Sequence, residues 1–144
     1  MWKNEVSIDI AAPPEKMFRY LSDFSRHGEW SMSVAKIEQV TPGQVGVGTE
    51  FKASESIPQK FESFARITAL DAPKLVAWES TDHKVFRTSW EMEISPKAGG
   101  THLVQRVTFH SISLFGRVFL LIRKTQVEPE NLKSLNRIKI ILEK

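Results

Sequence analysis

Apolar and polar residues alternate along the first ten positions of the chain. Residues 2–10 follow the two-residue period of a half-buried β-strand. Proline is tolerated in the first turn of a helix, so Pro14 is expected to open a short helix that ends at Ser22-Asp23. A second short helix or turn is expected to run through His27 and Trp30.

Short strands separated by turn residues are predicted next, and from Leu114 the apolar spacing becomes helical and stays so to the end. The predicted strands are 34–40, 49–56, 59–70, 75–80, 86–96 and 101–111. Strands joined by tight turns are antiparallel neighbours. This order of elements predicts an α+β fold in which one curved antiparallel sheet wraps a long C-terminal helix.

Two tight turns, at 71–74 and 97–100, allow the pairing of their strands to be predicted. The first hairpin pairs Leu70 with Leu75, Ala69 with Val76, Ile67 with Trp78, Ala65 with Ser80, and Arg66 with Glu79. The second pairs Pro96 with Thr101, Met92 with Gln105, Trp90 with Val107, Thr88 with Phe109, and Glu91 with Arg106. Each hairpin then has one apolar and one charge-paired face, and a one-residue slip would invert both.

The segment 81–85 is expected to join these hairpins, with Ser80 opposite Phe86 and Trp78 opposite Thr88. The outer face then carries a row of polar side chains, namely Arg66, Glu79, Arg87 and His110. Such a row resembles an active site, but it lies on the predicted solvent side, where ion pairs contribute about 0–1 kcal/mol. We interpret it as a surface ladder.

The inner face of the predicted sheet mixes large aromatic residues with small ones. On a strongly curved sheet, large neighbours cannot close completely over small ones, and an aromatic hollow with a few hydroxyls is typical of a small-molecule pocket. The alternative is that the terminal helix fills this space. The expected cavity lining is Ser63, Ala65, Ile67, Trp78, Ser80, Thr88, Trp90, Gln105, Val107 and Phe109 from the sheet, with Phe119 and Ile122 from the helix.

The C-terminal helix has two predicted apolar stripes with helical spacing. They consist of Phe115, Val118, Phe119 and Ile122, and of Leu132, Leu135, Ile138 and Leu142. Pro129 lies between them and is expected to kink or break the helix. Leu120 and Leu121 widen the first stripe, which favours simple burial but also fits a lid or a dimer contact, so a monomer or homodimer is expected.

Composition narrows the classes of function. The 144 residues suit a single domain, 1–144, and a net charge of +3 is too small and scattered to indicate nucleic-acid binding. There is no cysteine, no apolar run near the ~20 residues of a membrane span, and no expected signal peptide, which fits a cytoplasmic protein. The basic residues that gather toward the C-terminus are interpreted as a solvated helix face rather than a contact with an anionic surface.

No catalytic set is predicted, and the catalytic residues stay unassigned. No cluster indicates a metal and no motif indicates a cofactor, since Gly46-Val47-Gly48 precedes a strand and is interpreted as a turn. His27 is expected at the surface. A buried Glu55 would have a raised pKa and could act as a base, but its place at a strand end favours an exposed glutamate.

Several short motifs follow one another along nearly the whole chain. They are APPEKMF at 12–18, Asp23-Phe24 leading to Trp30, GVGTEF at 46–51, DAPKLVAWE at 71–79 and ENLKSLNRI at 130–138. In this order they resemble the START/Bet v 1-like superfamily, specifically its polyketide cyclase/dehydrase-type (SRPBCC) proteins. The resemblance implies a helix-grip fold, a seven-stranded antiparallel sheet around a long C-terminal helix, and a hydrophobic ligand such as a polyketide, sterol, lipid or quinone. It implies no single activity.

Three functions follow, in order of preference. The first is binding or transport of a hydrophobic small molecule in the cavity. The second is a polyketide cyclase-like or dehydratase-like enzyme in which Gln105, Thr88 and Glu55 bind an enolate or carbonyl oxygen. The third is a lipid- or quinone-handling partner of membranes or proteins that uses the stretch 115–124, although membrane contact is not favoured.

Overall fold

A computed structural model describes residues 1–55, 61–80, 86–111 and 113–144 of the protein. One seven-stranded antiparallel sheet has the order β1-β7-β6-β5-β4-β3-β2. The strands are β1 (Trp2–Ile10), β2 (Val34–Gln39), β3 (Glu50–Glu55), β4 (Phe61–Asp71), β5 (Leu75–Ser80), β6 (Phe86–Lys97) and β7 (Gly100–Ser111). The helices are α1 (Pro14–Ser22), the 3-10 turn η1 (Phe24–Arg26), α2 (His27–Trp30) and α3 (Leu114–Leu142).

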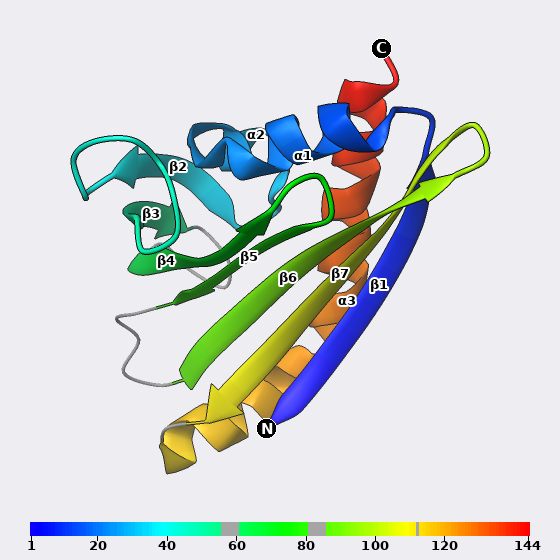
Figure 1. Ribbon diagram of the computed structural model, residues 1–144. Helices are drawn as coiled ribbons and strands as arrows, with labels where there is room; N and C mark the ends of the chain where they lie inside the picture. The colour runs from blue at the N-terminus through cyan, green and yellow to red at the C-terminus, as the bar shows by residue number, and fades with distance from the viewer. Residues whose placement is uncertain (56–60, 81–85, 112) are drawn as a thin grey trace.

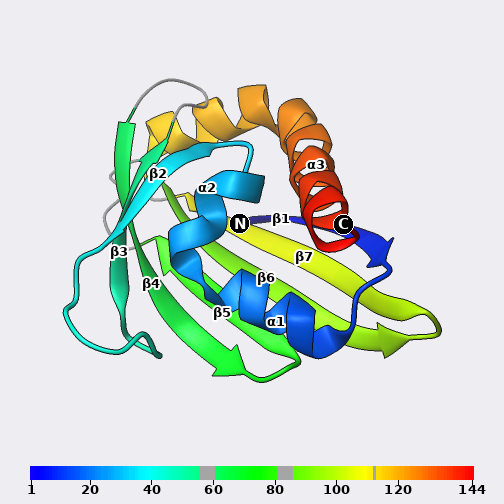
Figure 2. The same ribbon diagram turned by 90° about the horizontal axis from the view of Figure 1, so that it is seen from above.

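This arrangement confirms the predicted α+β helix-grip fold. The sheet curves like a half-barrel around α3, while α1 and α2 lie across one end of it (Figure 1, Figure 2). The alternating apolar side chains of the strands face inward and form the main core with residues of α1 and of the second half of α3.

The pairing of β6 with β7 is confirmed over its full predicted length, with Trp90 opposite Val107. The pairing of β5 with β6 differs, because Trp78 lies opposite Trp90 rather than Thr88, and that prediction is wrong by two residues. In the observed register the two indoles stack, with centroids 6.1 Å apart and an interplanar angle of 7°. A register shift of two residues leaves every side chain on its predicted face of the sheet, because side chains alternate with a period of two. The predicted connection 81–85 lies outside the described residues.

The hairpin of β4 and β5 follows the prediction only in part. Ile67 lies opposite Trp78 as expected, but a bulge follows it, so that Ala69 lies opposite Ala77 and Leu70 opposite Val76. The two pairs predicted nearest the turn are therefore wrong. A bulge adds one residue to one strand only, which moves all pairs beyond it by one position.

The start of β7 is held tightly against the end of β1. A Cβ atom at Gly100 would lie 2.1 Å from the carbonyl oxygen of Ile10, so only glycine fits there. Beside it, the buried hydroxyl of Thr101 donates a hydrogen bond of 2.6 Å to the carbonyl of Ala12. These contacts fix the short segment that leads from the sheet into α1.

Helix α3 begins at the predicted residue and is unbroken across Pro129. Of the expected kink or break at Pro129, the break is absent, and Figure 2 shows that the helix bends along its length. At its start, the Ser113 hydroxyl accepts a hydrogen bond of 3.0 Å from the Gly116 amide and caps the helix. Near its end, Leu135 and Ile138 are fully buried, as the second predicted stripe requires.

The first predicted stripe of α3 is wrong. Three of its members are exposed, namely Phe115, Val118 and Ile122. The helix turns Leu120 and Val127 toward the sheet instead, because both pack into a small second apolar cluster. In the second stripe, Leu132 is exposed although it was predicted to face inward. The neighbouring Asn131 is buried instead, and its side chain donates a hydrogen bond of 3.1 Å to the side chain of Asn4.

Replacing Gly100 by alanine is expected to lower the free energy of unfolding by about 1–3 kcal/mol, because the new methyl group meets backbone atoms that cannot move aside. Gly46→Ala is the matched control, since a Cβ there meets nothing within 4 Å. It should change the same quantity by about 0.5 kcal/mol or less. Urea unfolding of both variants tests this, and equal midpoints would contradict the close approach.

Candidate functional site

A cavity of about 160 Å³ lies between the concave face of the sheet, α2 and α3. The predicted residues that line it are Ser63, Ala65, Trp78, Ser80, Thr88, Trp90, Gln105, Phe109 and Phe119. Ile67 and Val107 are packed in the cores beside it and are not part of the lining. Ile122 is 67 % exposed, so its prediction is wrong, because α3 is turned differently about its axis. The helix does not fill the space.

One wall of the cavity is a run of aromatic rings from η1, α2, β5 and β6. The ring of His27 lies 4.1 Å from Phe24, 4.8 Å from Trp30 and 5.1 Å from Trp78, between centroids. Trp78 in turn stacks on Trp90. Phe24, His27 and Trp30 also line the cavity and are not among the predicted lining residues. Their spacing of three residues, which places them on one side of a helical segment, is the signal that could have found them.

His27 is buried, which corrects its expected position at the surface. Its Nε2 atom donates a hydrogen bond of 3.0 Å to the Leu21 carbonyl, so this nitrogen carries the proton. Burial lowers the pKa of His27 to about 4, and the hydrogen bond to Leu21 and the charge of Asp23 oppose this shift only in part. The imidazole is therefore neutral at pH 7 and belongs to the aromatic wall.

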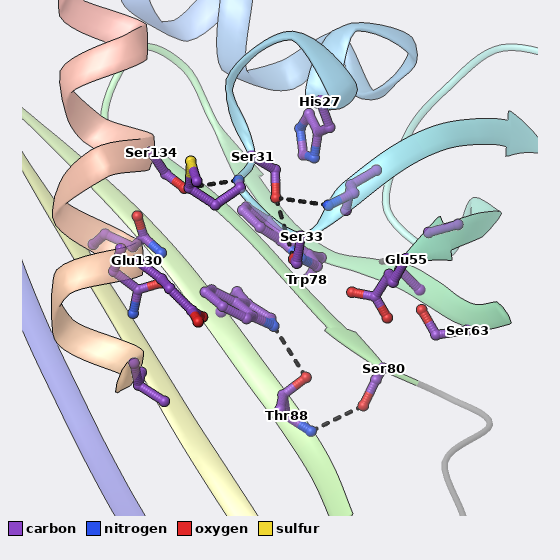
Figure 3. A pocket seen from close by; sticks show the side chains of 18 of the residues that line it. His27, Ser31, Ser33, Glu55, Ser63, Trp78, Ser80, Thr88, Glu130 and Ser134 are labelled. Atoms are coloured by element: carbon purple, nitrogen blue, oxygen red, sulfur yellow. Dashed lines mark hydrogen bonds between the residues drawn. The ribbon is translucent and has the colours of Figure 1, made fainter. Parts of the chain in front are cut away.

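A carboxyl group stands across the cavity from helix α3. Glu55 ends β3, and Figure 3 shows it beside Ser63, on the far side of the pocket from Glu130. Burial raises the pKa of Glu55, while hydrogen bonds from the hydroxyls of Ser63 and Ser33 act in the opposite direction. Glu55 was expected to be an exposed, ordinary glutamate because it ends a strand. It is instead partly buried in the cavity lining, which corrects that expectation.

The hydroxyl groups of the lining are oriented by local hydrogen bonds (Figure 3). The Ser80 hydroxyl accepts from the Thr88 amide at 2.9 Å, and the Thr88 hydroxyl accepts from Nε1 of Trp90 at 3.0 Å. On the helix side, the Ser134 hydroxyl accepts from the Met32 amide at 3.0 Å. These bonds give the polar part of the lining a defined geometry.

Helix α3 contributes Phe119, Leu120 and an ion pair to the lining. The guanidinium of Arg123 donates to both carboxylate oxygens of Glu130, at 3.1 and 2.9 Å. The two side chains are only 14 % and 25 % exposed, and such two-point pairs are among the stronger polar contacts in proteins. The pair spans two helical turns and braces the part of α3 that contains Pro129.

Two lining residues each have a buried polar atom that forms no hydrogen bond within the described part of the chain. These atoms are Nε1 of Trp30, a donor, and Oε1 of Gln105, an acceptor. The two residues are 3 % and 2 % exposed. Leaving a buried polar atom unpaired costs roughly 1–3 kcal/mol, and native structures supply a partner for nearly all of them. Two residues of the lining thus hold an unpaired donor and an unpaired acceptor, in addition to the hydroxyl and carboxyl groups described above.

The polar row on the outer face of the sheet is a surface feature. Arg66 and Glu79 form an ion pair of 2.7 Å and are 46 % and 33 % exposed. The row does not continue from Glu79 to Arg87, because Glu79 lies opposite Ser89. Within the described ranges, no three histidine, aspartate or glutamate side chains come together in a way that could hold a metal ion.

Comparisons with known proteins agree with this fold. A family model described as "Polyketide cyclase / dehydrase and lipid transport" matches residues 1–143. No curated protein matches the sequence.

Solved structures of the same fold share little sequence with this chain. The Zhui aromatase/cyclase from Streptomyces sp. R1128 has a TM-score of 0.82 at 16 % identity, over 99 % of this chain and 93 % of that one. A START superfamily protein from Mycobacterium smegmatis has a TM-score of 0.79 at 12 % identity, over 97 % and 98 %. Ara h 8.0201 has a TM-score of 0.66 at 18 % identity, over 95 % and 97 %. Such likenesses show the fold alone.

The burial of His27 predicts a pH dependence of stability. Between pH 6.5 and about 4 the unfolded chain binds a proton at His27 and the folded protein does not, so the free energy of unfolding falls as the pH drops through this range. The full effect is roughly 3 kcal/mol. His27→Gln keeps a donor near Leu21 but does not titrate, so its unfolding free energy should fall less over the same range. Parallel curves from urea unfolding of the two proteins would contradict this.

Proposed function

We propose that this chain, which belongs to the family described as polyketide cyclase / dehydrase and lipid transport, binds a compact hydrophobic small molecule in its cavity. The observation that carries the proposal is the lining itself, in which an aromatic wall adjoins two buried polar atoms without partners. Apolar walls provide affinity, and a few polar groups fix the orientation of a ligand. The proposed contacts are Trp30, Ser63, Ala65, Trp78, Ser80, Thr88, Trp90, Gln105, Phe109 and Phe119.

The volume of the cavity limits the size of the ligand. About 160 Å³ is close to the roughly 150 Å³ of an engineered cavity that binds benzene. One ring or two fused rings therefore fit without rearrangement of the walls. A sterol or a long acyl chain requires the lining to move.

The two unpaired atoms define the polar chemistry of the ligand. Nε1 of Trp30 is a donor and would pair with a ligand oxygen that accepts a hydrogen bond. Oε1 of Gln105 is an acceptor and would pair with a ligand O–H or N–H group. A phenol or an enol carries both functions on one oxygen or on neighbouring atoms. The proposed ligand class is therefore a small aromatic or enolic molecule with a hydroxyl group.

Filling the cavity is expected to abolish binding of 2-naphthol, which fluoresces and carries one hydroxyl on two fused rings. Ala65→Phe places a ring in the cavity, whereas Thr68→Phe places the same ring on an exposed position of the same strand. The first variant should weaken binding by about tenfold or more, through loss of the space for at least one ring, and the second should leave it unchanged. Equal affinities of both variants and the wild type would place the bound dye elsewhere.

The polar part of the proposal is tested by comparing 2-naphthol with naphthalene. The wild type should prefer 2-naphthol by about fivefold, the worth of one hydrogen bond. Gln105→Met removes the acceptor at similar volume and should reduce this preference while it preserves naphthalene binding. If the wild type shows no preference, bound water rather than a ligand satisfies these atoms.

Glu55 supports a second function, which we propose as the alternative: a cyclase-like or dehydratase-like enzyme. Its carboxylate would take a proton from a methylene group between two carbonyls of the substrate, and the resulting carbon would attack a ketone of the same molecule. This attack closes the ring, and the new alkoxide takes up the proton that Glu55 had accepted. Loss of water then forms a double bond in the ring. Donors from Thr88 and Gln105 would stabilise the enolate oxygen. The raised pKa of Glu55 suits a group that both accepts and returns a proton.

Glu55→Gln is expected to lower the turnover of a linear poly-β-ketone thioester by about 100-fold, since it removes the base. Glu62→Gln, at an exposed position of β4, is the control. Product formation is followed by mass spectrometry, with 2-naphthol binding measured in parallel. If the wild type and Glu55→Gln yield the same product at the same rate, the enzyme proposal fails and ligand binding stands on its own.

A further inference from the structure

The first half of α3 presents a row of large apolar side chains to solvent. Leu114, Phe115, Val118, Leu121 and Ile122 are between 51 % and 77 % exposed. Their spacing of three, four and seven residues puts them on one side of the helix. We name these five residues the α3 apolar face. Contiguous exposed apolar surface of this kind marks a site of interaction with another apolar phase or molecule.

The charges around this face are all of one sign along the helix. From residue 111 to residue 127 the sequence contains Arg117, Arg123 and Lys124 and no acidic residue. Arg123 is engaged with Glu130. Arg117 is exposed, and the ammonium of Lys124 lies 5.6 Å from the centre of the Trp2 ring. The apolar face is therefore flanked by two basic side chains, the exposed Arg117 and the half-buried Lys124, that form no ion pair with another described residue.

The charge pattern favours a lipid surface over a second copy of the chain. A symmetric dimer brings the same patch of each copy together, so it would place these basic side chains against one another. An amphipathic helix with an apolar face and basic flanks is instead suited to lie in the interface of an anionic bilayer. No helix in the described ranges is long and apolar enough to cross a membrane.

The same helical segment forms a wall of the cavity on its other side. Phe119, Leu120 and Val127 line the cavity, and Leu120 and Val127 are buried. The α3 apolar face occupies the remaining side of the same turns. Contact through this face would bring the cavity wall against the lipid phase, in which a hydrophobic ligand dissolves.

We propose that the α3 apolar face docks the protein on anionic phospholipid membranes, with Phe115, Leu121 and Ile122 in the acyl boundary and Arg117 and Lys124 at the head groups. The inference goes beyond ligand binding and does not require it. It assigns a use to exposed side chains that neither the core nor the cavity explains.

Flotation with lipid vesicles tests this docking. The wild type should float with vesicles of phosphatidylcholine mixed with phosphatidylglycerol, and much less with phosphatidylcholine alone. Leu121→Glu should reduce the bound fraction about tenfold or more, because it places a charge in the apolar boundary. Ile140→Glu is the matched control, since Ile140 is 58 % exposed on the second half of the same helix, and it should bind like the wild type.

Charge removal gives a second, independent readout. Arg117→Gln and Lys124→Gln should each weaken binding to the anionic vesicles by about fivefold, the worth of one basic residue near such a surface. Both effects should shrink as salt is raised.

Three results would overturn the proposal. The first is no flotation of the wild type with either vesicle. The second is flotation that Leu121→Glu does not reduce. The third is a dimer in light scattering that Leu121→Glu converts to monomer, because the face would then be a subunit interface. Circular dichroism of each variant shows whether the fold is kept. Arg117, Leu121 and Ile140 are exposed, and Lys124 is half-buried beside Trp2.

Discussion

The docking of the second half of α3 onto the concave sheet is the interaction on which the rest of the structure depends. Leu135 and Ile138 are fully buried there, and burying an apolar side chain of this size contributes about 1.5–3 kcal/mol. The ammonium of Lys16 donates a hydrogen bond of 3.0 Å to the carbonyl of Leu142, which ties the end of α3 to α1. These contacts join the two ends of the chain, and the pairing of β1 with β7 does the same within the sheet.

The two halves of α3 differ in how firmly they pack against the sheet. The second half supplies most of the helix's buried apolar side chains and meets the main core, whereas the first half has only a small cluster around Leu120 and Val127. Pro129 lies between the halves and removes one backbone hydrogen bond of the helix. The ion pair of Arg123 with Glu130 spans this position. The half that lines the cavity and faces solvent is therefore the less firmly held half.

The sequence predicted the fold well because alternation and turn chemistry act locally. The hairpin of β6 and β7 follows from its turn, whereas the bulge after Ile67 has no local signature and depends on packing across the sheet. The stripe of α3 was misplaced because nearly every residue from 114 to 122 is apolar, so spacing alone does not select a face. The burial of His27 and the partial burial of Glu55 depend on elements far apart in sequence, which no periodicity reveals.

The cavity also affects the free energy of unfolding of the protein. A sealed apolar hollow of this size would cost about 4 kcal/mol, at about 24 cal/mol for each Å³. This hollow is partly open and carries hydroxyl and carboxyl groups, so its cost is smaller. A single larger side chain at Ala65 would remove part of this cost without disturbing the strand pairing. A ligand present at 100 times its dissociation constant returns about 2.7 kcal/mol. The hollow therefore costs the empty fold stability, and a bound ligand restores part of that cost, as expected of a binding site.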